Sequence, residues 1–254
     1  MLPLVRFSHY IYMLITAILL LVLTAYINGI FQPPDSWKVA EGNENNGCTP
    51  RYGTDFQAHV TPENTEILRI ASHISSIEEA YVIATQWAYV SDRRLNGVDD
   101  RWSSPYEFLT ASPSHYSNPV PGMVAGDCEE QANTLAAIIR ALGVPPEYVR
   151  VVLGLNDAGS IEKGHVWVEV YISDTWYILD PSTGYYWDDD AEQLVQRKGL
   201  PFDYYLLNEY PVSWITAYYN DKYYCDYETG SDSVPLLWQQ DISDINPKTI
   251  SGIE

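Results

Sequence analysis

The stretch GDCEEQANTLAAIIRALG, residues 126–143, decides the fold class of the chain around it. Its apolar residues recur at spacings of three, four and three, as on one face of an α-helix: Ala132, Leu135, Ile139 and Leu142. Gly143 supplies a stop signal, and Cys128 falls in the first turn. Unpaired backbone N–H groups and the helix dipole stabilise a thiolate at that position. Two hypotheses stay open: Cys128 is a nucleophile, or it is a small buried hydrophobe.

Two strands are expected downstream, with polar side chains that could act together with Cys128. In GHVWVEVYI, residues 164–172, alternation puts His165 on the face opposite the aliphatic side chains. TWYILDPS, residues 175–182, carries Asp180, and the two residues between these runs can form a tight hairpin turn. In that register Asp180 lies diagonal to His165 on the same face, where such pairs are roughly 7 to 8 Å apart. A three-residue loop would shift the register by one residue, and His165 and Asp180 would no longer share a face.

Helices are also expected before the cysteine. One follows Thr61 and runs through Ile67, Ile70 and Ile74, and a second begins after Ser76. The spacing of their apolar residues predicts that both helices pack against the core.

These segments resemble the transglutaminase-like superfamily, in which a Cys box, a G-H-x-W-x-E-like strand and a strand ending in L-D-P carry a Cys-His-Asp triad. The resemblance covers about residues 76–182. It implies an α+β fold with a papain-like cysteine-enzyme core, in which the helix carrying the cysteine packs on an antiparallel sheet. It assigns Cys128 as nucleophile, His165 as base and acid, and Asp180 as the group that orients the imidazole.

The chemistry implied by this resemblance is acyl transfer through a thioester. His165 would take the proton of Cys128 and deliver it to a leaving amine, while Asp180 fixes the ring tautomer. Water resolving the thioester makes a peptidase or amidase, and an amine resolving it makes a cross-linking transglutaminase. By analogy with the superfamily we expect hydrolysis of protein or peptide amides. The cross-linking enzyme and a catalytically inactive binding module stay open as alternatives.

The N-terminus predicts export. Residues 10–30 hold no formal charge and are long enough, at 1.5 Å per residue, to cross a hydrocarbon layer of ~30 Å. Arg6 precedes this run and acidic residues follow it, which places the N-terminus in the cytoplasm. A cleavable signal peptide is the alternative. Both interpretations put the bulk of the chain outside the cytoplasm, anchored to the cell membrane or secreted.

The expected domain organisation follows from these segments. Residues 1–31 are the cytoplasmic N-terminus and the transmembrane signal anchor, and residues 32–52, rich in Pro, Gly and Asn, are a linker. Residues 53–254 form the extracytoplasmic domain, with its core at about residues 76–182 and an aromatic-rich elaboration at residues 185–254.

Composition excludes one class of partner. The chain has 34 acidic against 14 basic residues, a formal charge of −20 that repels phosphate backbones. We therefore expect no nucleic acid, a protein or peptide substrate outside the cytoplasm, and contact with the membrane through one N-terminal helix. With 46% hydrophobic residues, the 254-residue chain can bury a sizeable core.

Two tryptophans are candidate substrate-binding residues. Trp102 lies in the loop before the cysteine and could line the cleft or help to bind an oxyanion, although packing is the simpler role. Trp167 shares a strand face with His165.

The acids beside the cysteine raise a question of metal binding. Asp127 and Glu129 could help to bind calcium, with Asp99 and Asp100 as further ligands, by analogy with superfamily proteases that have D-C-E at the nucleophile. No cofactor is otherwise required. In the simpler alternative Asp127 caps the helix, and Glu129 and Glu130 point outward into solvent.

The remaining cysteines, Cys48 and Cys225, could form a disulfide outside the cytoplasm and leave Cys128 as the reactive thiol. The sequence does not choose between the bridged and unbridged forms, because it does not place their Cα atoms.

Overall fold

The computed structural model describes residues 56–156, 163–226 and 234–239. The chain divides into two units, residues 1–45 and 46–254, and every element described below belongs to the second. The expected membrane span, the linker and Cys48 lie outside the described residues. In the part of the chain that is described, no helix combines the length and the apolar character needed to span a bilayer.

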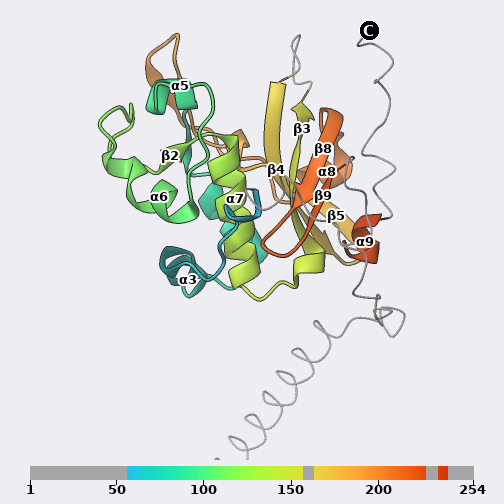
Figure 1. The fold of residues 1–254 in the computed structure, drawn as a ribbon. Coiled ribbons are helices and arrows are strands. Elements are labelled where there is room, and N and C mark those ends of the chain that lie inside the picture. The colour runs from blue at the N-terminus through green and yellow to red at the C-terminus, as the bar shows by residue number, and fades with distance from the viewer. Residues whose placement is uncertain (1–55, 157–162, 227–233, 240–254) are drawn as a thin grey trace, which may run out of the picture. The chain divides into compact units, whose positions relative to one another are not determined.

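The second unit is built from short helices and two sheets (Figure 1). Its α-helices are α3 (Thr65–Ala71), α4 (Ile77–Ala84), α5 (Asp92–Leu95), α6 (Pro105–Thr110), α7 (Cys128–Ala141), α8 (Tyr204–Leu207) and α9 (Leu236–Gln239). Its strands are β1 (Ala88–Tyr89), β2 (Ala125–Gly126), β3 (Val149–Asn156), β4 (Lys163–Ile172), β5 (Thr175–Leu179), β6 (Tyr186–Asp188), β7 (Gln193–Val195), β8 (Val212–Tyr219) and β9 (Tyr224–Asp226). Single turns of 3-10 helix are η2 (Ser112–Ser114), η3 (Pro146–Tyr148) and η4 (Pro181–Thr183).

Helix α7 is the central element. It lies between the five-stranded sheet and the helices α3 and α6 (Figure 1), and it also packs against α4. Gly143, at φ 91°, ends it in a conformation that glycine adopts without strain, as its sequence predicts. Every residue from Cys128 to Ile139 is buried. The helix therefore has no solvent face, whereas the spacing of its apolar residues predicted a single buried side.

The helices before α7 pack as expected but are shorter. Helix α3 starts at Thr65, where Asn64 rather than Thr61 is the N-cap and its side chain accepts a hydrogen bond from the Glu66 N–H. Helix α4 starts after Ser76, whose hydroxyl accepts a hydrogen bond from the backbone N–H of Glu79. Both helices contribute to the core around α7.

The larger sheet is antiparallel, with strand order β5-β4-β3-β8-β9. Its inner face packs on α7 through aliphatic side chains of β3, β4 and β5: Val149, Val151, Val166, Val168, Val170 and Leu179. Its outer face carries a second apolar cluster, in which residues of β3 and β4 pack with residues of β8, β9, α9 and the segments before β8 and α9: Val152, Trp167, Tyr210, Tyr218, Cys225, Val234 and Trp238. The aromatic-rich part of the chain after residue 185 thus completes the sheet and covers its outer face.

The hairpin between β4 and β5 has the predicted register. Ser173 and Asp174 are the only loop residues, both with positive φ (49° and 62°), and Ile172 pairs with Thr175. Such turns match the twist of the flanking strands. The diagonal placement of His165 and Asp180 depends on this two-residue loop.

The smaller sheet, with order β2-β1-β6-β7, fixes the segment that enters α7. Strand β1 runs parallel to both β2 and β6, and Tyr89 is aligned with Gly126, two residues before Cys128. The N–H of Val90 donates to the carbonyl oxygen of Gly126 at 2.9 Å. The start of α7 is therefore held by strand pairing as well as by the core.

Candidate active site

His165 and Asp180 meet as the register requires. The Nε2 atom of His165 lies 2.9 Å from Oδ2 of Asp180, and both side chains are largely buried. Burial opposes the imidazolium, but the charge of Asp180, this hydrogen bond and the charge of Asp127 favour it, and together they raise the pKa of His165 above its ordinary 6.5. With Nε2 bonded to the carboxylate, Nδ1 is the ring nitrogen left for a reacting group.

Asp180 is held from four directions. Its Oδ1 accepts hydrogen bonds from the backbone N–H of Ser182 at 3.0 Å and from the Ser182 hydroxyl at 2.6 Å. Its Oδ2 accepts from His165 and from the hydroxyl of Tyr210 at 3.0 Å. Burial alone would raise the pKa of this carboxyl, but His165, Ser182 and Tyr210 outweigh it and hold the pKa below its ordinary value. Asp180 is therefore a buried carboxylate that stays ionised.

Cys128 is both buried and at the helix start, so its position does not distinguish the two hypotheses about it. It is the first residue of α7, 8% of its surface is exposed, and it belongs to the core cluster. The backbone N–H of Val166, the residue after His165, interacts with its sulfur and favours the thiolate. This contact ties the cysteine to β4 next to the histidine.

The electrostatics around Cys128 favour the neutral thiol. Burial raises its pKa well above the ordinary value, and the charges of Glu129 and Asp127 raise it further. The thiol donates to Oε2 of Glu129 at 3.3 Å. Ionisation of this cysteine therefore needs a base that removes the proton during attack, or a positive charge that offsets the acids.

The glutamates after Cys128 do not point into solvent. Glu129 and Glu130 are buried, 5% and 3% exposed, because α7 is covered on all sides. Glu130 accepts hydrogen bonds from the backbone N–H groups of Ser103 (2.7 Å) and Asp127 (3.2 Å). The outward orientation that the sequence suggested for these two residues is wrong. Because both carboxyl groups are buried, solvent screens their charges from the thiol only weakly.

These acids form one buried carboxyl cluster. Asp92, Asp127, Glu129 and Glu130 each offer a carboxylate oxygen to groups of three whose atoms all lie within 4.8 Å of one another. Burial is the first cause of a raised pKa in each: about 10 for Asp127, about 7 for Glu129, and well above the ordinary value for Glu130. Like charges this close cannot all stay ionised without a compensating positive charge.

The cluster has the donor set of a hard cation. One group joins Asp92, Asp100 and Glu129, and Oδ1 of Asp127 is buried with no hydrogen-bond partner among the described residues. Calcium prefers carboxylate oxygens, so these residues fit it. Asp100 thus lies where the sequence suggested a ligand, whereas Asp99 is in none of these groups and pairs with Arg93. Asp92, which the sequence reasoning missed, belongs to two of them.

The two tryptophans occupy different environments. Trp102 packs on Phe56, with ring centroids 4.8 Å apart, and its indole N–H donates to Asp100 at 3.1 Å. Trp167 is completely buried, and its indole N–H donates to Glu169 at 3.1 Å. Trp167 therefore has no surface to offer a substrate, because the C-terminal elements cover the outer face of the sheet. Trp102 remains at the edge of the carboxyl cluster.

Two partners of Asp180 were not found from the sequence. Ser182 follows it in the L-D-P-S segment, where an Asp at an N-cap position is a recognisable signal for such hydrogen bonds. Tyr210 lies thirty residues later in an aromatic-rich segment, and no spacing rule connects it to Asp180.

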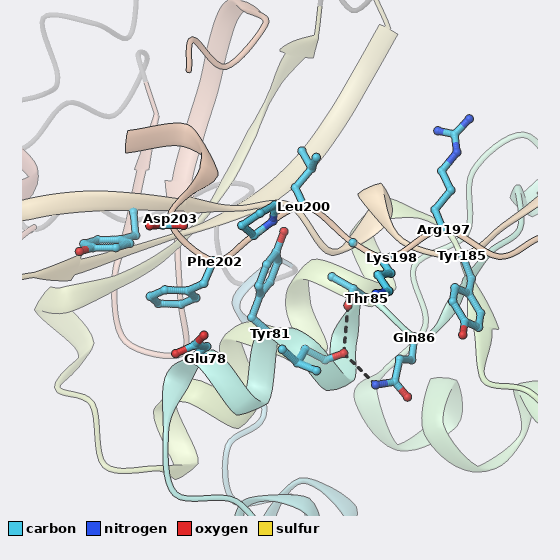
Figure 2. A pocket seen from close by; sticks show the side chains of 14 residues that line it. Glu78, Tyr81, Thr85, Gln86, Tyr185, Arg197, Lys198, Leu200, Phe202 and Asp203 are labelled. Carbon is cyan, nitrogen blue, oxygen red and sulfur yellow. Dashed lines mark hydrogen bonds between the residues drawn. The ribbon is translucent and has the colours of Figure 1, made fainter. Parts of the chain in front are cut away.

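A separate pocket of about 820 Å³ lies between α4 and the segment 197–203 (Figure 2). Tyr81 rises from α4 towards Leu200, with Phe202 beside it. None of the site residues expected from the sequence lines this pocket. The Tyr81 hydroxyl links this pocket to the candidate site, because it donates to the backbone carbonyl of Asp180 at 3.4 Å.

Comparison with known proteins supports the fold and family. Residues 68–181 match the family model of the transglutaminase-like superfamily. Among curated proteins none matches the chain significantly.

Solved structures give weaker likenesses. A proposed cysteine protease from Cytophaga hutchinsonii has 19% identity and a TM-score of 0.36, over 51% of this chain and 41% of that protein. Calcium-bound LapG from Legionella pneumophila has 16% identity and a TM-score of 0.41, over 74% of this chain and 100% of that protein. EGTA-treated LapG has 15% identity and a TM-score of 0.38, over 68% and 94%. TM-scores below 0.5 are too low to support a conclusion about this chain.

The family match ends one residue after Asp180 and contains the Cys box, the G-H-x-W-x-E strand and the L-D-P strand. The α+β architecture, with the cysteine at the start of a central helix packed on an antiparallel sheet, agrees with it. Residues 68–181 of this chain therefore belong to the transglutaminase-like superfamily.

Proposed function

We propose that the chain is a thiol enzyme that cleaves protein or peptide amides through a thioester on Cys128. The observation that carries this proposal is the 2.9 Å hydrogen bond from His165 to a fully bonded, ionised Asp180, with β4 placing the residue after His165 against the sulfur. A buried carboxylate that is itself held by hydrogen bonds fixes the tautomer and the orientation of an imidazole, as a catalytic triad requires.

The proposed reaction has two stages, the formation of a thioester and its hydrolysis. Nδ1 of His165 accepts the thiol proton while the sulfur bonds to the carbonyl carbon of the substrate, and collapse of the adduct breaks the C–N bond as His165 protonates the leaving amine. Water then adds to the thioester, with His165 as base, and releases the acid and the thiol. His165 must be neutral to accept the thiol proton. Because its pKa is raised, the reaction rate should increase as the pH rises through that pKa.

Hydrolysis is favoured over transfer on the resemblance to the superfamily alone. A cross-linking enzyme would resolve the same thioester with an amine, and a catalytically inactive domain would only bind a partner. We further propose that the domain works outside the cytoplasm, tethered to the membrane by residues 10–30, on a protein or peptide and not on nucleic acid.

Calcium is proposed for the carboxyl cluster. Asp92, Asp100, Asp127 and Glu129 would supply oxygen ligands. Bound there, a divalent cation would supply positive charge that offsets the acids beside the thiol.

The test is the rate at which iodoacetamide alkylates Cys128 in the full chain purified in mild detergent. Peptide mass spectrometry separates Cys128 from the other cysteines, and Cys128→Ser verifies the assignment. His165→Ala should slow the reaction at least about tenfold, since a general base contributes 10²–10⁴-fold in catalysis. His73→Ala, which alters an exposed histidine outside the site, is the matched control. Equal rates in wild type and His165→Ala would exclude the enzyme.

A second measurement separates hydrolysis from transfer. A peptide mixture incubated with the protein and a fluorescent primary amine should yield new peptide N-termini when water is the acceptor. Fluorescent peptides without new N-termini would identify a cross-linking enzyme. If neither product forms although Cys128 reacts with iodoacetamide, the mixture contains no substrate. The assay is then repeated with folded proteins in place of the peptides.

A further inference from the structure

We infer that Tyr210 is a positioning residue for His165 and acts through Asp180; the inference rests on the thiol-enzyme function proposed above. Tyr210 lies between α8 and β8, outside the family-matched residues 68–181. Its hydroxyl and the imidazole of His165 bond the same oxygen of Asp180 at 3.0 and 2.9 Å. A residue of the C-terminal elaboration thus completes the hydrogen bonding of the candidate triad.

The geometry shows what the hydroxyl supplies. Ser182 donates both of its hydrogen bonds to Oδ1 of Asp180, so it fixes that oxygen and does not hold Oδ2. The Tyr210 hydroxyl holds the second oxygen in place and directs it at the imidazole. Without this donor, Oδ2 keeps one hydrogen bond where it now has two, in a site from which water is excluded. The ring of His165 would then lose its fixed orientation.

Tyr210 is itself fixed by its aromatic neighbours. Its ring lies 4.9 Å from Trp167 and 4.8 Å from Tyr205, the latter at 90°. Trp167 in turn stacks on His165, with ring centroids 6.2 Å apart and an interplanar angle of 24°. Aromatic pairs at such distances and angles stabilise one another beyond the area that they bury. Trp167 therefore supports the imidazole and Tyr210 from one side, which gives a role to its burial.

The groups that face Asp180 come from several elements. They are His165 on β4, Tyr81 on α4, Tyr205 on α8 and Tyr210. Tyr81 donates to the backbone carbonyl of Asp180 and not to its carboxylate. Burial, followed by the charge of Asp180, raises the pKa of Tyr210 well above its ordinary value, so its hydroxyl remains a donor throughout the working pH range.

The test compares Tyr210→Phe with Tyr205→Phe in the full chain. Both variants keep an aromatic ring, and only the first removes a donor from Asp180. Tyr210→Phe should slow iodoacetamide alkylation of Cys128 about tenfold at a temperature where circular dichroism shows the variant still folded, because hydrogen bonds to charged groups are the stronger ones. Tyr205→Phe should stay within about twofold of wild type. Equal rates for Tyr210→Phe and wild type would overturn the inference.

A spectroscopic readout distinguishes positioning from packing. In protein labelled with ¹³C at the Asp carboxyl groups, the titration midpoint of Asp180, assigned with Asp180→Asn, should rise in Tyr210→Phe and stay unchanged in Tyr205→Phe. If Tyr210→Phe does not fold, the wild-type spectrum decides instead. A slowly exchanging Tyr210 hydroxyl proton that vanishes in Asp180→Asn supports the inference, and its absence rejects it.

The outcomes also separate this inference from the proposed function. If His165→Ala slows alkylation and Tyr210→Phe does not, the thiol enzyme stands and the positioning role falls. If His165→Ala has no effect, the enzyme itself falls. In the Asp180→Asn background, Tyr210→Phe should have no further effect on the rate, since the hydroxyl acts only through the carboxylate. An independent, additive loss would contradict action through Asp180.

Discussion

Gly184 lies so close to Thr85 that a Cβ on Gly184 would fall 1.8 Å from the carbonyl oxygen of Thr85. The same carbonyl accepts a hydrogen bond from the N–H of Tyr185 at 3.3 Å. This contact joins the end of α4 to the chain four residues after Asp180, where β6 begins. The φ of Gly184 is −84°, so the close approach of Thr85, and not a positive φ, is the reason to expect glycine here.

Gly184→Ala should therefore lower the free energy of unfolding by about 3 kcal/mol, the upper part of the range for overpacking, because backbone must move to admit the methyl group. Gly164→Ala is the matched control, since a Cβ there meets nothing within 4 Å. Urea unfolding of both variants measures the difference. Similar stability of the two alanine variants would show that the contact is looser than described.

A buried ion pair on the outer face of the sheet predicts a second large effect. Nη2 of Arg150 lies 2.6 Å from Oε2 of Glu169. The guanidinium carbon of Arg150 lies 4.0 Å from the ring centroid of Trp176 and 3.9 Å from that of Tyr218. Glu169→Gln removes the negative partner and should cost about 3 kcal/mol of unfolding free energy, because the buried guanidinium loses its countercharge.

The control for that pair is Glu66→Gln in α3. Glu66 pairs with Arg69 at 2.7 Å, but the side chains are 27% and 61% exposed, and such pairs contribute under about 1 kcal/mol. Urea denaturation at two salt concentrations should find the Glu66 effect small and screened, and the Glu169 effect large and nearly independent of salt. Equal losses would argue against burial as the cause.

The raised pKa of His165 predicts how stability depends on pH. Between the ordinary value of 6.5 and the higher folded value, the folded state binds more protons than the unfolded state. The stabilisation from His165 is thus fully present below about pH 6.5 and is lost as the pH rises through the folded pKa. Comparing wild type with His165→Gln at each pH, in chelator, isolates the pH dependence that involves His165, including its coupling to Asp127. The advantage of wild type should shrink from pH 5.5 to pH 8.5, and growth over that range would have the wrong sign.

The carboxyl cluster predicts a calcium effect that distinguishes two neighbouring acids. Calcium at a hundredfold excess over its Kd should stabilise the wild type by about 2.7 kcal/mol relative to chelator. Asp100→Asn should weaken this effect, and Asp99→Asn should leave it intact, because only Asp100 belongs to the group with Asp92 and Glu129. Thermal unfolding with graded calcium measures both. No response in wild type would mean that the acids are neutralised by protons instead.

The features that the sequence predicted well are local. The hairpin register depends on two turn residues, and it fixes where His165 and Asp180 lie relative to each other. The end of α7 depends on Gly143. Both outcomes follow from backbone geometry within a few residues, so one sequence is enough to find them.

The features that the sequence missed depend on what covers an element. Glu129 and Glu130 were expected in solvent because charged residues in a first helical turn are commonly exposed, but α7 is enclosed by the sheet and by α3, α4 and α6. Asp92 and Tyr210 join the site from distant segments that carry no spacing signal. Long-range packing decides such contacts, and periodicity does not report it.

The pairing of β3 with β8 also determines when the site can form. Val152 on β3 pairs with Tyr218 on β8, so the middle of the sheet is closed by a strand that lies far along the chain. Bringing distant segments together costs loop-closure entropy before their contacts form and stabilise the chain. This pairing is therefore expected to be a slow step in folding. Tyr210 reaches Asp180 from the segment that leads into β8. A newly made chain should therefore acquire an oriented His165 late, after α7 and the hairpin, so that thiol reactivity appears only once folding is nearly complete.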